Sequence, residues 1–476
     1  MGKNFKIGLL GIGLENYWSQ FDNLKNRLLG YLNILEDKMN MMHPNIINVG
    51  LVDSVKKSRE AGILFKKEDV SIIFLYVTTY ALSSTVIPLI KKVNVPVIIL
   101  NLSPEISIKY KTFNALKNRK SMTGEWLAYC NSCPVPEISN VFKRLKIPFN
   151  EILGVLTNPD DECWNEIQDW IDSAKVAHEL FYNNMGLMGH YYGGMLDIYT
   201  NLTQVYAQFG GHIQMIEVDE LSHLVKKSNS IETNQKIEDF KYEFEINKDC
   251  KILDLEKAAK TSVALDKIVE KYSLGSIAYY YKGSGNEQNK NTMSSIILGT
   301  SLLTIKGIPV AGEYEVKNCI AMKILSLFGV GGSFTEYYAV DFNDDIVLMG
   351  HDGPGHTKIA EGKAKVKPLE VYHGKVGDGL SIEMSVKNGP VTLLSVIESE
   401  KGDFEFLVAE GESVSGPILE IGNTNSRYKF KNGAKSFIKN WNSFGPAHHC
   451  AIGVGHIHHK IEKLAKILNI KVNYVN

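Results

Sequence analysis

The first part of the chain alternates short apolar, β-branched runs with amphipathic segments of helical length. The runs and the segments occupy residues 5–13, 20–42, 47–53, 52–66, 71–79 and 95–102. This rhythm is typical of βαβ units around a parallel sheet. Ligands in such sheets gather in the loops after the strands, which draws attention to residues 11–18 and 77–83.

A second cycle of the same kind is expected to begin near Ile152. Its expected elements are strands at 151–157, 212–220 and 274–283, helices at 160–181 and 289–303, and a glycine- and tyrosine-rich run at 186–201. The segment 226–251 is polar and charged, and we expect it to be a helical or mobile excursion on the surface.

The pattern changes after Gly331, where short strands arrive between Gly, Asn and Asp turns. They are expected at 333–342, 345–351, 369–374, 380–386, 391–398 and 403–412, and a helix at 456–467 is expected to finish the chain. This pattern indicates an antiparallel sandwich or barrel. The sequence therefore predicts two doubly wound, Rossmann- or flavodoxin-like α/β domains, at 1–178 and 179–330, followed by a C-terminal antiparallel β domain at 331–476.

Charge and composition narrow the classes of partner. The 476 residues include 52 basic and 53 acidic ones, and the formal net charge is -1, so we expect no nucleic-acid partner. The apolar runs are far shorter than the roughly 20 residues that a membrane helix needs. Six cysteines in so long a chain, with no expected export signal, are best explained as reduced thiols. We therefore expect a cytoplasmic protein.

Histidines concentrate near the C-terminus. Of the 13 in the chain, eight lie in the last 126 residues: His351, His356, His373, His448, His449, His456, His458 and His459. Imidazole is the commonest transition-metal ligand, and carboxylates join it where a hard ion such as Mn²⁺ is held. Acids near these histidines are therefore candidate ligands.

Three places combine such groups. Glu313 opens an expected helix, although it or Glu315 alone would also complement the positive helix N-terminus. Glu336 and His351 lie on consecutive strands that a hairpin would bring together, or they are an exposed strand acid and a loop histidine. The pair at 448–449 follows a Gly-Pro turn. Because neighbouring strand residues face opposite ways, we expect at most one of the pair to reach a given ion.

Four motifs around these residues resemble the metal-site motifs of the L-arabinose isomerase family, in order and in spacing. They are GEYEVK, SFTEYYAVDF, VLMGH and GPAHHCAIG. The resemblance implies that Glu313, Glu336, His351 and His449 hold Mn²⁺, with Co²⁺ or Mg²⁺ as alternatives. It also implies two α/β domains, a C-terminal β domain and a homo-oligomer, commonly a hexamer.

The implied reaction is aldose-ketose isomerisation, with L-arabinose to L-ribulose as the first expectation. The proton moves between C1 and C2 through an enediol, for which a metal stabilises the developing charge. Glu313 and Glu336 are then the acid and the base, without an order between them. His448 is expected to orient the sugar or to support the ligands.

Other positions are substrate candidates. The run at 186–201 resembles the wider fucose isomerase-like group, which adds His190 and Asp197, and the loop at 11–18 adds Glu15 and Trp18. In the related L-fucose isomerases an Asp joins the metal shell, but strand alternation places Asp341 on the face opposite Glu336.

The chain departs from the arabinose isomerase pattern after His351, where HDGPGH replaces apolar residues, so the sugar stays open. An isomerase of another sugar, such as L-fucose or D-arabinose, differs only in pocket residues. A metal-dependent hydrolase or epimerase on the same scaffold is a second alternative. A sugar-binding regulator is a third, but it calls for a DNA-binding module, and the sequence shows no helix-turn-helix pattern.

Overall fold

The computed structural model describes residues 4–280, 286–372, 375–376 and 379–475. Its contacts divide the chain into two compact units, Lys3–His178 and, from Glu179 onward, a second unit that ends at Asn476. The ends of two predicted strands, at 281–283 and 373–374, lie outside the described residues, and so does His373.

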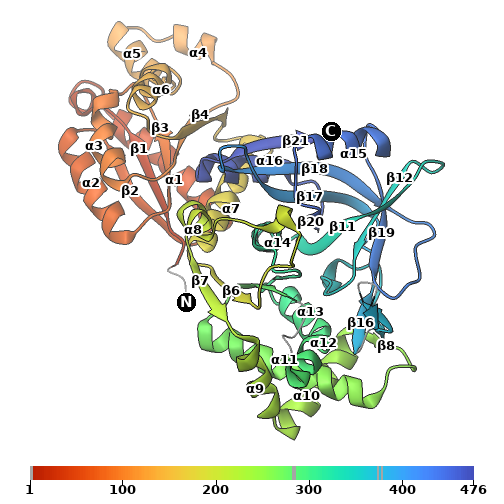
Figure 1. The fold of residues 1–476 in the computed structure, drawn as a ribbon. Helices are drawn as coiled ribbons and strands as arrows, with labels where there is room; N and C mark the ends of the chain where they lie inside the picture. Colours follow the sequence, from red (N-terminus) through yellow and green to blue (C-terminus); the bar gives the residue numbers. More distant parts are fainter. Residues whose placement is uncertain (1–3, 281–285, 373–374, 377–378, 476) are drawn as a thin grey trace. The chain divides into compact units, whose positions relative to one another are not determined.

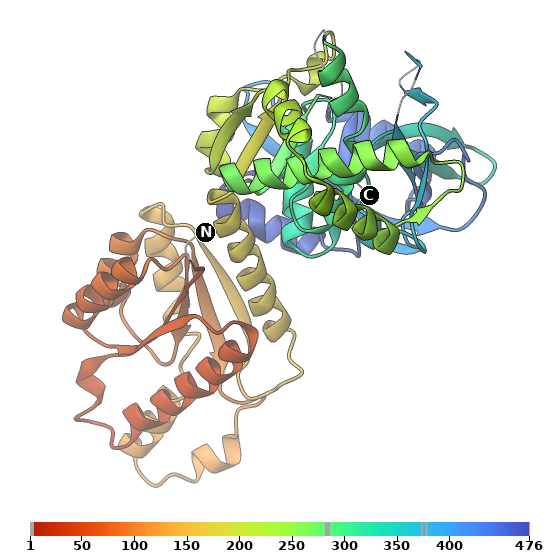
Figure 2. The same cartoon turned by 90° about the horizontal axis from the view of Figure 1, so that it is seen from below.

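The N-terminal unit is built on a five-stranded parallel sheet in the order β2-β1-β3-β4-β5. The strands are β1 (Ile7–Ile12), β2 (Ile46–Val52), β3 (Ile72–Val77), β4 (Val97–Ser103) and β5 (Phe149–Val155). The helices are α1 (Leu24–Met42), α2 (Val55–Glu68), α3 (Ser83–Val93), α4 (Tyr110–Asn114), α5 (Arg119–Leu127), α6 (Val135–Arg144) and α7 (Cys163–Phe181). Side chains of α2, α3 and α6 share one core with the sheet, and Figure 2 shows helices along both of its faces. Covering both faces explains why β1 and β3 are apolar throughout.

The expectation that residues 151–157 open the second cycle was wrong. This segment is β5, which pairs with β4 from Val97↔Phe149 to Ser103↔Val155 and completes the first sheet. The helices α4 to α6 form the connection from β4 to β5, and a parallel neighbour needs such a long crossover.

The second unit begins with a four-stranded parallel sheet in the order β10-β9-β6-β7. Its strands are β6 (Asn184–Met188), β7 (His212–Ile216), β9 (Ser276–Tyr279) and β10 (Val310–Ala311). Its helices are η2 (Leu196–Ile198), α8 (Leu202–Phe209), α9 (Val218–Lys226), α10 (Ser230–Glu243), α11 (Ile252–Tyr272), α12 (Glu287–Ser294), α13 (Ile297–Ile305) and α14 (Val316–Leu327). The polar excursion is largely α10, which packs against α11, and the single helix expected at 289–303 is divided between α12 and α13.

The C-terminal part contains a seven-stranded sheet in the order β17-β20-β11-β12-β19-β18-β21. Because β17 also pairs with β18, the first six strands close into an antiparallel barrel (Figure 1). They are β11 (Gly331–Asp341), β12 (Ile346–His351), β17 (Gly389–Glu398), β18 (Phe404–Val414), β19 (Thr424–Lys429) and β20 (His449–Val454). The predicted fold class, parallel α/β sheets followed by an antiparallel domain, is thus confirmed.

Shorter elements complete this part of the chain. They are η3 (Thr357–Ile359), β13 (Lys365–Pro368), β14 (Val371–Tyr372), β15 (Lys375–Val376), β16 (Leu380–Glu383), α15 (Ala434–Ser443), α16 (His458–Leu468) and β21 (Lys471–Val475), and β8 (Glu245–Ile246) pairs with β13. The expectation that a helix finishes the chain was wrong, because β21 follows α16 and adds to β18 in parallel. Within the described ranges, no helix has the length and apolar character needed to cross a bilayer.

The barrel leaves no room for a side chain at Gly350, on β12 between β11 and β19. A Cβ added there would lie 1.9 Å from the carbonyl oxygen of Thr424 and 2.8 Å from the Cα of Asn425. Because both contacts are backbone of a paired strand, relief requires that β12 and β19 separate.

We therefore predict that Gly350→Ala lowers the free energy of unfolding by about 3 kcal/mol, at the upper end of overpacking effects. Urea unfolding followed by circular dichroism measures this. The control is Gly193→Ala, where nothing lies within 4 Å of the added Cβ, and its expected effect is within about 0.5 kcal/mol. Equal stability of the two variants would contradict the barrel register.

Candidate metal centre

The register of the barrel brings two of the predicted ligands together. Strand β11 lies between β20 and β12, and Glu336 on β11 is directly opposite His449 on β20. Directly opposed residues of an antiparallel pair project from the same face, with Cβ atoms roughly 5 Å apart. Two residues 113 positions apart in the chain, by their numbers, thus become neighbours through strand pairing alone.

The third predicted ligand, His351, ends β12 and is buried. Its ring centroid lies 5.1 Å from that of His449. Phe334, two residues before Glu336, packs against both imidazoles, with centroid distances of 4.4 Å to His351 and 4.3 Å to His449. This aromatic contact restricts the orientation of both rings.

Glu313, in the turn between β10 and α14, also lies close to His449. Glu313 and Tyr314 both have left-handed backbone, with φ of 56° and 61°. The conformation costs roughly 1 kcal/mol for each residue that is not glycine, and such strain clusters at functional sites. The amide of Tyr314 donates to the carbonyl of Tyr279 on β9, which ties the turn to the sheet.

These groups converge on one imidazole nitrogen. The Nε2 atom of His449 lies 3.6 Å from Oε2 of Glu313 and 3.9 Å from Oε2 of Glu336. This nitrogen is buried and has no hydrogen-bond partner among the described residues. Burial raises the pKa of Glu336, and the neighbouring Glu313 and Glu315 add to the rise while the two histidines oppose it. Two carboxylates around a bare imidazole nitrogen are a donor set that fits a divalent cation.

Glu315 explains why that nitrogen is bare. Its carboxylate accepts a hydrogen bond from Nδ1–H of His449, and both side chains are about 1% exposed. With Nδ1 carrying the proton, Nε2 presents its lone pair, as in the carboxylate-histidine pairs that support metal ligands. Sequence reasoning considered Glu315 only at the helix N-terminus and missed this contact. The Glu-x-Glu spacing of GEYEVK was the one available signal.

His448 also reaches the centre, contrary to the alternation argument. Its Nε2 lies 3.6 Å from the same Oε2 of Glu313, and its ring centroid is 3.8 Å from that of His449. Alternation fails because β20 begins at His449, so His448 belongs to the preceding turn. Although burial lowers the pKa of His448, the carboxylates of Glu313 and Asp197 raise it to about 9. Glu313, His448 and His449 form a group of donor atoms within 4.8 Å of one another.

Asp197 holds His448 in this position. Its Oδ2 atom lies 2.6 Å from Nδ1 of His448 and also accepts the backbone N–H of that residue at 3.0 Å. Asp197 lies on η2, after the first strand of the four-stranded sheet, so the contact joins that sheet's loops to the barrel.

The other predicted residues lie elsewhere. Asp341 accepts the backbone N–H groups of Asn343 and Asp344 in the turn between β11 and β12. His190 is on the exposed loop after β6, with its ring against Tyr280.

Glu15 and Trp18 belong to the N-terminal unit. Glu15 is exposed, and the Trp18 indole donates to Asp53. Substrate contacts by Glu15, Trp18 and His190 stay predictions.

The HDGPGH loop, residues 351–356, is largely buried. Burial, with a smaller effect of Glu336, raises the pKa of Asp352 to about 6. Burial lowers the pKa of His356 to about 4, so this ring is neutral near pH 7, and its backbone N–H donates to Ser333. The loop therefore adds a carboxylate near Glu336 where the family pattern is apolar.

A cavity of about 310 Å³ borders the centre. Its lining includes Asp197, Glu336 and His448 of the candidate centre and Trp441 and Asn442 of α15. Three of the candidate residues thus face one cavity.

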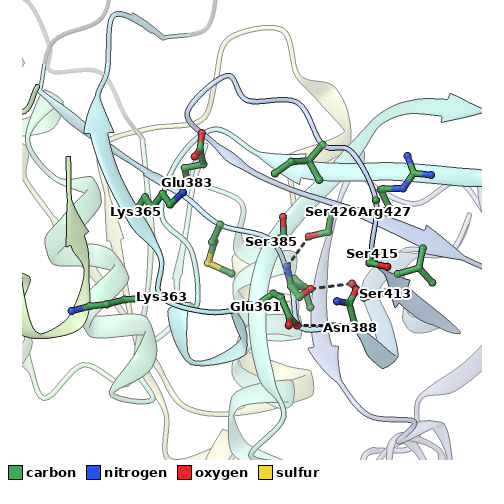
Figure 3. A pocket seen from close by; sticks show the side chains of 15 residues that line it. Glu361, Lys363, Lys365, Glu383, Ser385, Asn388, Ser413, Ser415, Ser426 and Arg427 are labelled. Atoms are coloured by element: carbon green, nitrogen blue, oxygen red, sulfur yellow. Dashed lines mark hydrogen bonds between the residues drawn. The ribbon is translucent and has the colours of Figure 1, made fainter. Parts of the chain in front are cut away.

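A second cavity of about 310 Å³, in the C-terminal part, is drawn in Figure 3. None of the predicted ligands lines it. Polar groups within it bond one another, since Glu361 accepts the backbone N–H of Asn388 and Ser426 accepts that of Val386. We do not assign a site there.

Comparison with known proteins gives a domain match for the C-terminal part of the chain. The model of the L-arabinose isomerase C-terminal domain matches residues 331–471, which contain Glu336, His351 and His449. Curated proteins give no significant sequence match.

A crystal structure of an ABC transporter solute-binding protein from Agrobacterium vitis with bound D-fucose aligns over 64% of this chain and 93% of its own, at 8% identity and a TM-score of 0.12. That score is too low to support an argument. The domain match does support a sugar isomerase, and the matched domain contributes three of the four predicted ligands. Residues 331–471 of this chain are thus similar to the C-terminal domain of L-arabinose isomerase.

Proposed function

We propose that this protein is a metal-dependent aldose-ketose isomerase that converts L-arabinose to L-ribulose. The observation that carries the proposal is the convergence of Glu313 and Glu336 on the buried, bare Nε2 of His449 inside an arabinose isomerase domain. Glu313, Glu336, His351 and His449 would hold Mn²⁺, or Co²⁺ or Mg²⁺ in its place. As part of the same proposal, the protein is a cytoplasmic homo-oligomer.

The chemistry requires a base for the C2 proton of the aldose and a proton donor at C1. Glu313 and Glu336 each have a carboxylate oxygen near Nε2 of His449. One of them can take the C2 proton and return it to C1, while the other moves the hydroxyl proton from O2 to O1. A bound divalent ion would stabilise negative charge on the C1 and C2 oxygens of the enediol. Burial of Glu336 raises its pKa toward neutrality, which suits a group that accepts and returns a proton.

We predict that chelator-treated protein is inactive and that Mn²⁺ restores conversion of L-arabinose to L-ribulose. Ketose formation is measured for L-arabinose, L-fucose, D-arabinose and D-galactose with the full-length chain. We expect Glu336→Gln to lower kcat by about 10² to 10⁴, the typical contribution of a positioned acid or base. The control is Glu400→Gln, an exposed loop residue, which should match the wild type.

Each result bears on a different part of the proposal. Isomerisation of another sugar only would overturn the L-arabinose assignment and keep the mechanism. Mn²⁺ binding without isomerisation of any sugar would point to a hydrolase or an epimerase on the same scaffold.

A second prediction concerns Glu315, which orients the ring of His449. Glu315→Gln keeps the size of the side chain and removes the charge that fixes the Nδ1–H tautomer. We expect the Kd for Mn²⁺ to rise about 10- to 100-fold, as for other groups that support metal ligands. Titration calorimetry on metal-stripped protein measures this, with Glu400→Gln as the control. An unchanged Kd with an intact fold would remove Glu315 from the proposal.

A further inference from the structure

The two histidines at 448–449 share one hydrogen-bonding pattern. In each ring Nδ1 faces a carboxylate, which is Asp197 for His448 and Glu315 for His449. In each ring Nε2 then lies 3.6 Å from the same atom, Oε2 of Glu313. His448 thus has the same two kinds of carboxylate contact as His449, the predicted ligand beside it.

From this pattern we propose that His448 is itself a ligand of the metal, with Asp197 as its positioning residue. The inference rests on the proposed function, because it concerns the ion that this function requires. It enlarges the predicted ligand set from two imidazoles to three, and it replaces the expectation that His448 contacts the sugar.

The distances suit coordination. Donor atoms around a first-row ion, with bonds of about 2.1 Å, lie about 3 Å apart when adjacent and about 4.2 Å apart when opposite. One donor atom from each of Glu313, His448 and His449 falls within 4.8 Å of the others. Small side-chain movements therefore close the three groups on a single ion.

Hydrogen bonds to both the backbone and the side chain of Asp197 hold this residue in position. Its backbone carbonyl accepts a hydrogen bond from Lys317 at 2.8 Å, and Lys317 is a buried residue of α14, two positions after Glu315. Its carboxylate binds both the ring and the backbone N–H of His448. Such double recognition fixes the turn before β20 as well as the ring, so Nε2 of His448 is aimed at Glu313.

The competing role, a hydrogen bond from Nε2 of His448 to a sugar hydroxyl, predicts different data. A sugar contact would change KM and leave Mn²⁺ binding to the sugar-free protein unaltered. A ligand changes Mn²⁺ binding in the absence of any sugar. The decisive experiment is therefore Mn²⁺ binding without substrate.

We would titrate Mn²⁺ into metal-stripped, full-length protein by calorimetry for the wild type, His448→Gln, Asp197→Asn and the double variant. The control is His212→Gln, an exposed histidine on β7. We expect the Kd of His448→Gln to rise at least about 10-fold, and that of Asp197→Asn to rise by a similar factor. The double variant should be no weaker than His448→Gln alone, because Asp197 acts through His448.

Pulsed electron paramagnetic resonance of the Mn²⁺ form gives an independent measure, since each imidazole ligand couples a ¹⁴N nucleus to the ion. The coupling assigned to one imidazole should be lost in His448→Gln and kept in His212→Gln. Unchanged Kd and unchanged nitrogen coupling in His448→Gln would overturn this inference and leave the proposed function standing. A wild-type protein that binds no Mn²⁺ would overturn both.

Discussion

The pairing of β11 with β20 is the constraint on which the candidate centre depends. It places Glu336 directly opposite His449, and the pairing of β11 with β12 on its other side brings His351 to the same end of the barrel. A shift of one residue in either pairing would turn a ligand to the opposite face of the sheet. Closure of the barrel through β17 and β18 supports this register, because β17, the neighbour of β20, would otherwise be an edge strand.

The parallel α/β sheet contributes what the barrel does not hold. Glu313 and Glu315 come from the strained turn after β10, and Asp197 comes from the loops after β6. These are carboxyl ends of parallel strands, where α/β sheets usually gather ligands. At the centre the sheet therefore supplies Glu313, Glu315 and Asp197, and the barrel supplies the imidazoles and the carboxylate of Glu336. Each imidazole of the 448–449 pair is hydrogen bonded to a carboxylate from the sheet side.

Much of this arrangement could be predicted from the sequence, because it follows from local periodicity. The alternation of apolar runs and helical segments gave the parallel sheets, and the closely spaced strands after Gly331 gave the antiparallel domain. The motif order singled out Glu313, Glu336, His351 and His449, and the structure gathers them. Where prediction failed, the cause was long-range pairing. β5 has the same local pattern whether it ends one sheet or begins another, and β21 is too short to identify without its partner β18.

The roles of Glu315 and His448 were beyond sequence reasoning for a related reason. Whether a carboxylate two residues from Glu313 touches His449 depends on the left-handed turn at 313–314, which no propensity predicts for Glu and Tyr. The alternation rule for His448 assumed a strand that includes this residue, whereas β20 begins one position later, at His449. In both cases the contact forms where local rules give way to tertiary constraints.

The central claim is that one divalent ion binds where Glu336 and His449 meet. Anomalous diffraction from crystals of the full-length protein grown with Mn²⁺ tests it most directly. We expect a single strong peak about 2.0 to 2.4 Å from Nε2 of His449, with carboxylate oxygens of Glu313 and Glu336 at similar distances. A peak elsewhere, or none at saturating Mn²⁺, would contradict it.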